Sequence, residues 1–166
     1  MLFGAIVSNH IAYEMVAIDG KHNGYRHLVL PLARADELVM NAVMTVSTFH
    51  FLVHREARSQ LEGGTSWLQL TKPDTSALLE LPGPAQLYSR TLAILKHRHD
   101  LATCDSSTRH SVLLSLLVLL VGVTVTGSDD FPILFRVLES ALESIGGEDK
   151  LGEGDLPEFL VRQIRK

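Results

Sequence analysis

The most apolar stretch of the chain runs from Ser111 to Gly127 and contains eleven Leu or Val residues and no charged residue. In a helix these side chains would surround the axis on every side, which is typical of a helix inside a protein core. Residues 111–126 would extend about 24 Å at about 1.5 Å per residue, which is short of the roughly 30 Å hydrocarbon layer of a bilayer. The pattern therefore predicts a buried central helix, and a membrane span is the alternative.

Six further segments carry apolar residues at the spacing of one helix face. They are residues 2–18, 25–30, 36–55, 84–102, 130–145 and 156–164. No segment shows convincingly the period-two alternation of apolar and polar residues that marks a strand. The sequence therefore predicts an all-α fold: a single domain over residues 1–166, built as an irregular bundle of six or seven helices around the Leu/Val-rich central helix.

Capping and breaking residues set the expected boundaries of these helices. Asp36 and Asp130 are placed to cap the helices that follow them, and Pro31 is expected to disrupt the short helix in which it lies. Residues 56–83 lose the helical period and contain Gly63–Gly64. We therefore expect an exposed, partly disordered connection over residues 56–83.

The last two predicted helices have clear apolar faces. In the first, the residues expected inside are Phe131, Leu134, Phe135, Leu138, Leu142 and Ile145. In the second they are Leu156, Phe159, Leu160 and Ile164. The second helix reaches Lys166 without a stop signal, so we expect its apolar face to stay exposed and to mediate self-association or the binding of a protein partner.

Charge and cysteine content narrow the function classes. The formal net charge is −4, so no global field attracts nucleic acid or an anionic membrane. Cys104 is the only cysteine, which excludes an internal disulfide and any multi-cysteine zinc site. We therefore expect no direct specific DNA binding and no membrane association.

Two short motifs contain residue types that bind metals or phosphate. His50 and His54 share one helix face, as two zinc ligands would, but Phe51 stands where a metalloprotease motif has Glu and no third ligand is evident. The basic run Lys96–His99 suits a phosphate contact or, as we expect, the solvated end of its own helix. We therefore predict no metal-binding residue.

Candidate catalytic groups also have simpler interpretations. Asp129–Asp130 resembles a carboxylate pair, but its position before a helix start favours capping. Cys104 precedes the central helix, and no residue pattern supplies the oriented base that a nucleophile requires. We expect no catalytic residue, no cofactor-binding residue and no enzymatic activity.

Several motifs, in order along the chain, resemble the fungal-specific transcription factor domain. They are Asp19-Gly-Lys-His-Asn-Gly-Tyr-Arg-His-Leu-Val-Leu-Pro-Leu-Ala33, a helix ending Ser47-Thr-Phe-His50, Leu87-Tyr-Ser-Arg-Thr-Leu-Ala-Ile-Leu95, the Leu-rich central helix, Phe131-Pro-Ile-Leu-Phe-Arg-Val-Leu-Glu-Ser-Ala-Leu142 and Glu158-Phe-Leu-Val-Arg-Gln-Ile164. The resemblance covers roughly residues 10–55 and 84–166.

This resemblance implies the helical regulatory part of a nuclear, zinc-cluster-type transcription factor, which acts through protein partners or an unidentified small-molecule effector. In that family the DNA contacts come from a separate zinc cluster of six cysteines, which this sequence lacks. The chain is also shorter than the family's usual domain, so we expect a fragment or a truncated product. The alternatives are a membrane-associated protein anchored by residues 111–126 and a small-molecule-binding scaffold unrelated to transcription.

Overall fold

The computed structural model describes residues 23–61, 82–98 and 100–165. The elements are η2 (Tyr25–Val29), α3 (Leu30–Ala35), α4 (Glu37–Leu61), α6 (Pro84–His97), α7 (Ser106–Thr126), α8 (Phe131–Ile145), η4 (Glu148–Lys150) and α9 (Asp155–Ile164). No strand occurs among the described residues, and the predicted all-α fold is confirmed. The predicted helix over residues 2–18 and residues 62–81 of the predicted connection lie outside them.

Helix α7 is the centre of the bundle, as its apolar sequence predicts. Eleven residues between Ser111 and Val123 are buried, and α7 packs against α4, α8 and α9. By length and composition alone α7 is able to cross a membrane, but 67% of its most apolar window is buried inside the fold. Its Leu and Val side chains therefore have protein neighbours, as in a core helix.

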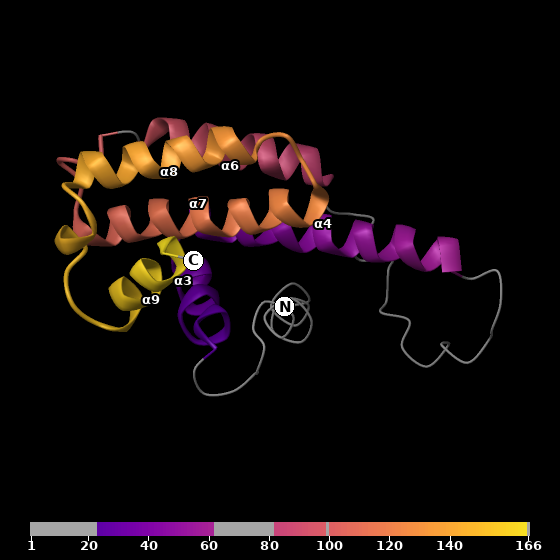
Figure 1. Cartoon of the computed structure of the whole chain (residues 1–166), viewed down its shortest axis with the longest axis horizontal. Coiled ribbons are helices and arrows are strands. Elements are labelled where there is room, and N and C mark those ends of the chain that lie inside the picture. The colour runs from indigo at the N-terminus through magenta and orange to yellow at the C-terminus, as the bar shows by residue number, and fades with distance from the viewer. Residues whose placement is uncertain (1–22, 62–81, 99, 166) are drawn as a thin grey trace.

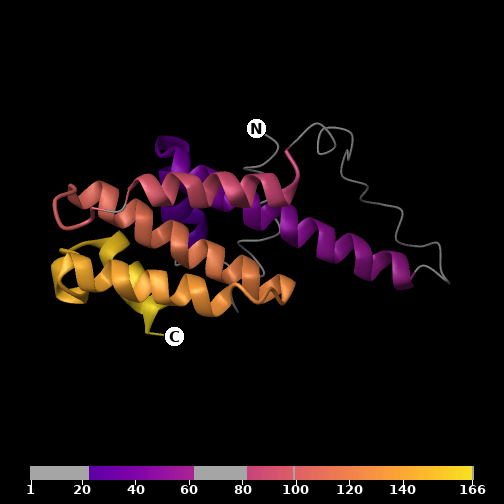
Figure 2. The same ribbon diagram turned by 90° about the horizontal axis from the view of Figure 1, so that it is seen from above.

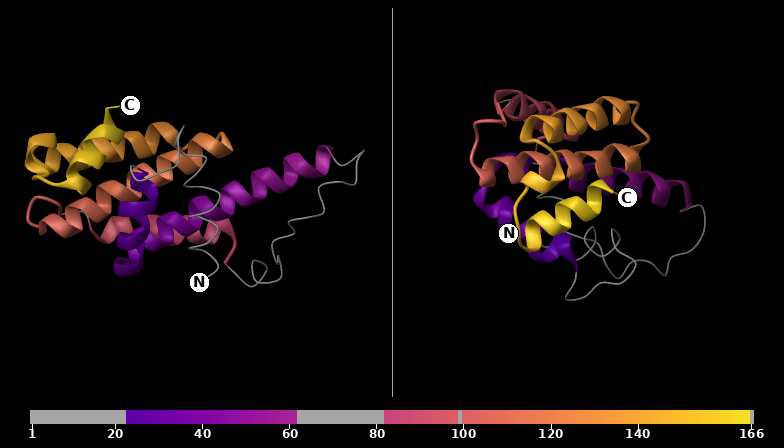
Figure 3. Two further views of the ribbon diagram at one scale, coloured as in Figure 1. Left: turned by 90° about the horizontal axis from the view of Figure 1, so that it is seen from below. Right: turned by 60° about the vertical axis from the view of Figure 1, so that its left-hand side comes forward.

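The four long helices lie in two layers (Figure 1), with α8 over α7 and α6 over α4. Seen from above, α6 and α8 lie on either side of α7 (Figure 2). Helix α9 and the η2–α3 segment lie on the opposite side of α7 from α6 and α8 (Figure 3). The central helix is thus covered from three directions.

Helices α4 and α7 approach closely at Gly122. A Cβ atom placed on this glycine would lie 2.8 Å from the Cγ2 atom of Val46. On its other side, α4 meets α6 through two buried hydroxyls, Thr45 and Thr91, whose Oγ1 atoms are 3.3 Å apart. Each hydroxyl also donates to a backbone carbonyl one turn earlier in its own helix, so both remain hydrogen-bonded in the core.

Two predicted boundaries are wrong. Helix α4 continues to Leu61, so residues 56–61 belong to a helix and not to the connection; they include the strong helix formers Glu, Ala, Arg and Gln. Helix α6 ends at His97 and not near residue 102. The reason is tertiary, because the next residue, Arg98, leaves the helix and binds Asp36.

The helical segment around Pro31 is short, as predicted, but it continues past the proline to Ala35. Pro31 lies in the first turn of α3, where a missing backbone N–H costs little. Just before it, the backbone N–H of Leu30 bonds to the carbonyl of Tyr25, which gives η2 the wider turn of a π-helix. A wide turn of this kind accommodates a proline without breaking the chain of helical residues.

Helix α9 is confirmed, but the prediction that its apolar face stays exposed is wrong. Phe159 is 4% exposed and Leu160 is 0% exposed. Phe159 packs edge-to-face on Tyr25, with ring centroids 5.3 Å apart, and its ring also lies against Gly24. Burial in this contact raises the pKa of Tyr25 to about 12. Gly24 and Tyr25 therefore cover the apolar face of α9 that was predicted to stay exposed.

Candidate functional site

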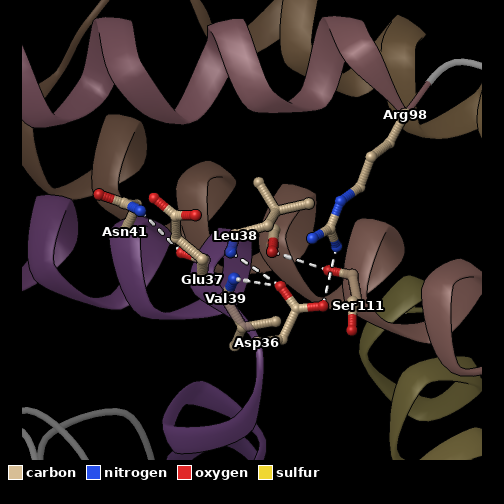
Figure 4. Close-up of polar contacts among 8 residues, drawn as sticks. Asp36, Glu37, Leu38, Val39, Asn41, Arg98 and Ser111 are labelled. Atoms are coloured by element: carbon tan, nitrogen blue, oxygen red, sulfur yellow. Dashed lines mark hydrogen bonds and ion pairs between the residues drawn. The ribbon is translucent and has the colours of Figure 1, made fainter.

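Asp36 ties three helices together at the junction of α3 and α4 (Figure 4). Its Oδ1 atom accepts a hydrogen bond from the backbone N–H of Leu38 at 2.8 Å, which is the predicted cap of α4. Its Oδ2 atom accepts one from Nη1 of Arg98, just beyond α6, also at 2.8 Å. Ser111 of α7 lies beside this carboxylate and helps to lower its pKa.

Opposing effects set the pKa of Asp36. Burial raises the pKa, whereas the Arg98 guanidinium, the Ser111 hydroxyl and the Leu38 N–H lower it, and together they hold it below its ordinary value. A carboxylate whose pKa is lowered by folding stabilises the fold at pH values above its unfolded pKa. That contribution is lost as the pH falls through the lowered pKa.

Asp36→Asn is expected to reduce stability at pH 7 by about 1–3 kcal/mol, because the charge-assisted bond to Arg98 is lost while asparagine still caps α4. The difference from the unsubstituted chain should start to shrink near the pKa of an unfolded aspartate, about 4, and should disappear as the pH falls through the lower pKa of Asp36 in the fold. Urea unfolding at pH 7 and pH 3, followed by circular dichroism, measures both effects. Asp149→Asn, on the exposed surface of η4, is the control; a difference for Asp36→Asn that stayed constant with pH would contradict the prediction.

A second polar contact links α6 to the start of α8. Asp130 occupies the N-cap position of α8, but its side chain makes no capping hydrogen bond, so the predicted role of this residue is wrong. Instead the Asp130 carboxylate lies near the Tyr88 hydroxyl and acts on its pKa. Burial raises the pKa of Tyr88 to about 12, and the nearby Asp130 carboxylate adds to the shift. This contact shows which side of α8 faces α6.

Helix α8 buries only a narrow stripe of its apolar surface. Leu134, Leu138, Ala141 and Ile145 are buried, and α7 is the main helix against which α8 packs. Two exposed flanks border this stripe: the aromatic flank, Phe131 (42% exposed) and Phe135 (41%), and the aliphatic flank, Ile133 (63%) and Val137 (44%). Ile133 and Val137 follow Asp130 at helical spacing and therefore lie on the side of α8 toward α6. The aromatic flank lies on the opposite side.

Helix α8 holds four of the five large hydrophobic side chains that are exposed among the described residues, the fifth being Val125. The sequence prediction placed Phe131 and Phe135 inside, and it is wrong because α8 packs mainly on a single helix. A signal for this surface is present in the sequence: six of the first eight residues of α8 are large and apolar. An apolar arc of that width exceeds what one neighbouring helix covers.

The other residues singled out in the sequence do not form a site. His50 lies on α4, but the structure does not describe the side chain of His54. Whether the two could bind one metal ion is therefore untested. Across the described ranges, no group of three or more His, Cys, Asp or Glu residues is placed to hold a metal ion. Cys104 is half-buried in the turn before α7. Within the basic run, Arg98 serves the Asp36 contact and is not part of a solvated face.

Comparisons with known proteins give one result. The sequence model of a family described as "Fungal specific transcription factor domain" matches residues 8–163. No curated protein and no solved structure matches the chain.

Proposed function

The chain belongs to the fungal specific transcription factor domain family, and we propose that it works there as a regulatory domain that contacts other proteins and performs no catalysis. The exposed surface of α8 is the observation that carries this proposal. A contiguous apolar patch rimmed by polar residues is typical of a protein interaction site. The exposed, stacked rings of Phe131 and Phe135 form such a patch on one flank of α8.

We also propose that a different part of the transcription factor binds DNA. The single cysteine cannot build a cysteine-rich zinc cluster, and a net charge of −4 does not favour phosphate contacts. We propose that this domain works in the nucleus, alongside a separate DNA-binding module. Its own contribution is then a contact that recruits, blocks or positions another protein.

The sequence predicts a partner contact through the last helix, α9, but α8 is better suited to it. Helix α9 buries Phe159 and Leu160 within the fold, so it has little apolar surface left for a partner. Helix α8 keeps such a surface. We therefore place the partner contact on α8.

A reporter assay tests the proposed function. The chain, fused to an unrelated DNA-binding domain whose site lies upstream of a reporter gene, is expected to change transcription at least several-fold. The chain expressed alone, with no DNA-reading module, is expected to leave the reporter unchanged. The unrelated DNA-binding domain without the chain is the control. A fusion that leaves transcription at the control level would contradict a regulatory role.

A further inference from the structure

The aromatic flank continues along α8 into two acidic residues. Phe131, Phe135, Glu139 and Glu143 recur at every fourth position, so they are neighbours along one file of the helix surface. All four side chains are exposed, and the two rings stack with centroids 6.0 Å apart and an interplanar angle of 12°. We call this set the α8 file. Its first half is apolar and its second half is acidic.

We propose that the α8 file is the docking site for an amphipathic helix of a partner protein whose apolar residues are followed along the same face by basic ones. This inference rests on the proposed function and names the kind of partner. The rings would accept the apolar side chains, because exposed aromatic groups dominate the energetics of many interfaces. The carboxylates would pair with Lys or Arg of the partner.

The charges near α8 support a basic partner. Between Asp129 and Lys150 the chain has six acidic and two basic residues, a local excess equal to the net charge of the whole chain. Neither Glu139 nor Glu143 forms an ion pair with another residue in the described part of the chain. An approaching cationic helix therefore meets carboxylates that no ion pair among the described residues neutralises, in a region of negative potential.

The order of residues in the α8 file argues against a second copy of the chain as the occupant. If two α8 helices packed antiparallel about their centres, the rings of Phe131 and Phe135 would face the carboxylates of Glu143 and Glu139. If they packed in parallel, equal carboxylates would face each other and repel. If they overlapped only at their rings, the carboxylates would pass the acidic Asp129–Asp130 end of the other copy. Each arrangement opposes pairing, whereas a basic helix satisfies both halves of the file.

Two synthetic peptides test the proposal. The first is an alanine-rich helix with two leucines followed by two arginines at four-residue spacing, and the second has glutamates in place of the arginines. Fluorescence anisotropy with the full chain is expected to show that the arginine peptide binds about tenfold more tightly at low salt, and that the preference shrinks in high salt. Equal binding of the two peptides, or no binding of either, would overturn the proposal.

Variants of the chain locate the site. Phe131→Ser with Phe135→Ser should weaken binding of the arginine peptide at least tenfold, because the apolar half is removed. Glu139→Gln with Glu143→Gln should leave the two peptides nearly equal in affinity. Ile133→Ser with Val137→Ser, on the other side of α8, is the matched control and should leave binding unchanged. Circular dichroism melting of each variant establishes that the fold persists, as expected for exposed positions.

Sedimentation velocity tests whether a second copy of the chain, and not a partner helix, occupies the α8 file. A dimer of the unsubstituted chain that Phe131→Ser with Phe135→Ser converts to a monomer would assign the surface to a second copy and overturn the proposal. The reporter assay gives an independent answer: a fusion that regulates transcription equally well without the two rings supports the regulatory function but removes the α8 file as its contact. A fusion with no effect, together with selective binding of the arginine peptide, would instead contradict the regulatory function alone.

Discussion

Leu116→Asp is expected to unfold the domain at 25 °C. Leu116 is fully buried in the central helix α7, and loss of its packing costs about 2–5 kcal/mol. A carboxyl group without a partner in that position costs several kcal/mol more. The sum is comparable to the whole stability of a typical domain, about 5–15 kcal/mol. Circular dichroism should therefore show loss of the helical signal or of a cooperative melt.

Val125→Asp is the matched control for this prediction. It introduces the same charge into the same helix, at a side chain that is 42% exposed, where water solvates the carboxylate. We expect a loss of about 1 kcal/mol or less, because a negative charge in the last turn of α7 is mildly unfavourable. If Leu116→Asp melted like the unsubstituted chain, the central position of α7 in the fold would be wrong.

Gly122→Leu is expected to cost about 3 kcal/mol or more, at the upper end of the usual range for overpacking. The first added carbon already lies 2.8 Å from Val46 Cγ2, so α4 and α7 would have to separate. Val46 is branched at its β-carbon and has few alternative rotamers on a helix. The midpoint of urea unfolding measures the loss.

A substitution at Val46 and a control at Gly83 test whether the clash with Val46 causes this loss of stability. Val46→Ala removes the atom that clashes, so the double variant Gly122→Leu with Val46→Ala should lose less stability than the sum of the single variants. Gly83→Leu is the control, because a Cβ atom at Gly83 meets no atom within 4 Å. Its cost should stay near the cap penalty of about 1 kcal/mol. Strict additivity at Gly122 and Val46 would show that the helices do not meet there.

Local features were predictable from the sequence. The burial of α7 follows from its own composition, because no polar face exists for water to solvate. The cap at Asp36 depends only on the next few residues, which the sequence displays. The position of α8 also follows from its period, its Pro132 and the glycine that ends it. These properties need no knowledge of the neighbouring helices.

The errors arose where distant residues decide the outcome. Arg98 is 62 positions away from Asp36, and no local pattern pairs them. The face of α9 was expected to be open because its cover, Tyr25, lies at the other end of the described chain. For α8 the error has the opposite direction, because its two rings were expected inside and are exposed. Periodicity shows that Phe131 and Phe135 are apolar, but only the number of neighbouring helices decides whether they are buried.

The contact between α4 and α7 also constrains the order of assembly during translation. Helices α4 and α6 are able to pair as soon as residue 98 has left the ribosome, but the side of α4 that meets α7 then has no cover. The stretch from Val46 to Gly122 takes roughly 4–15 s to synthesise at about 5–20 residues per second. During that interval Val46 and its apolar neighbours on α4 remain accessible to chaperones. The nascent domain is therefore most vulnerable to aggregation just before its central helix appears.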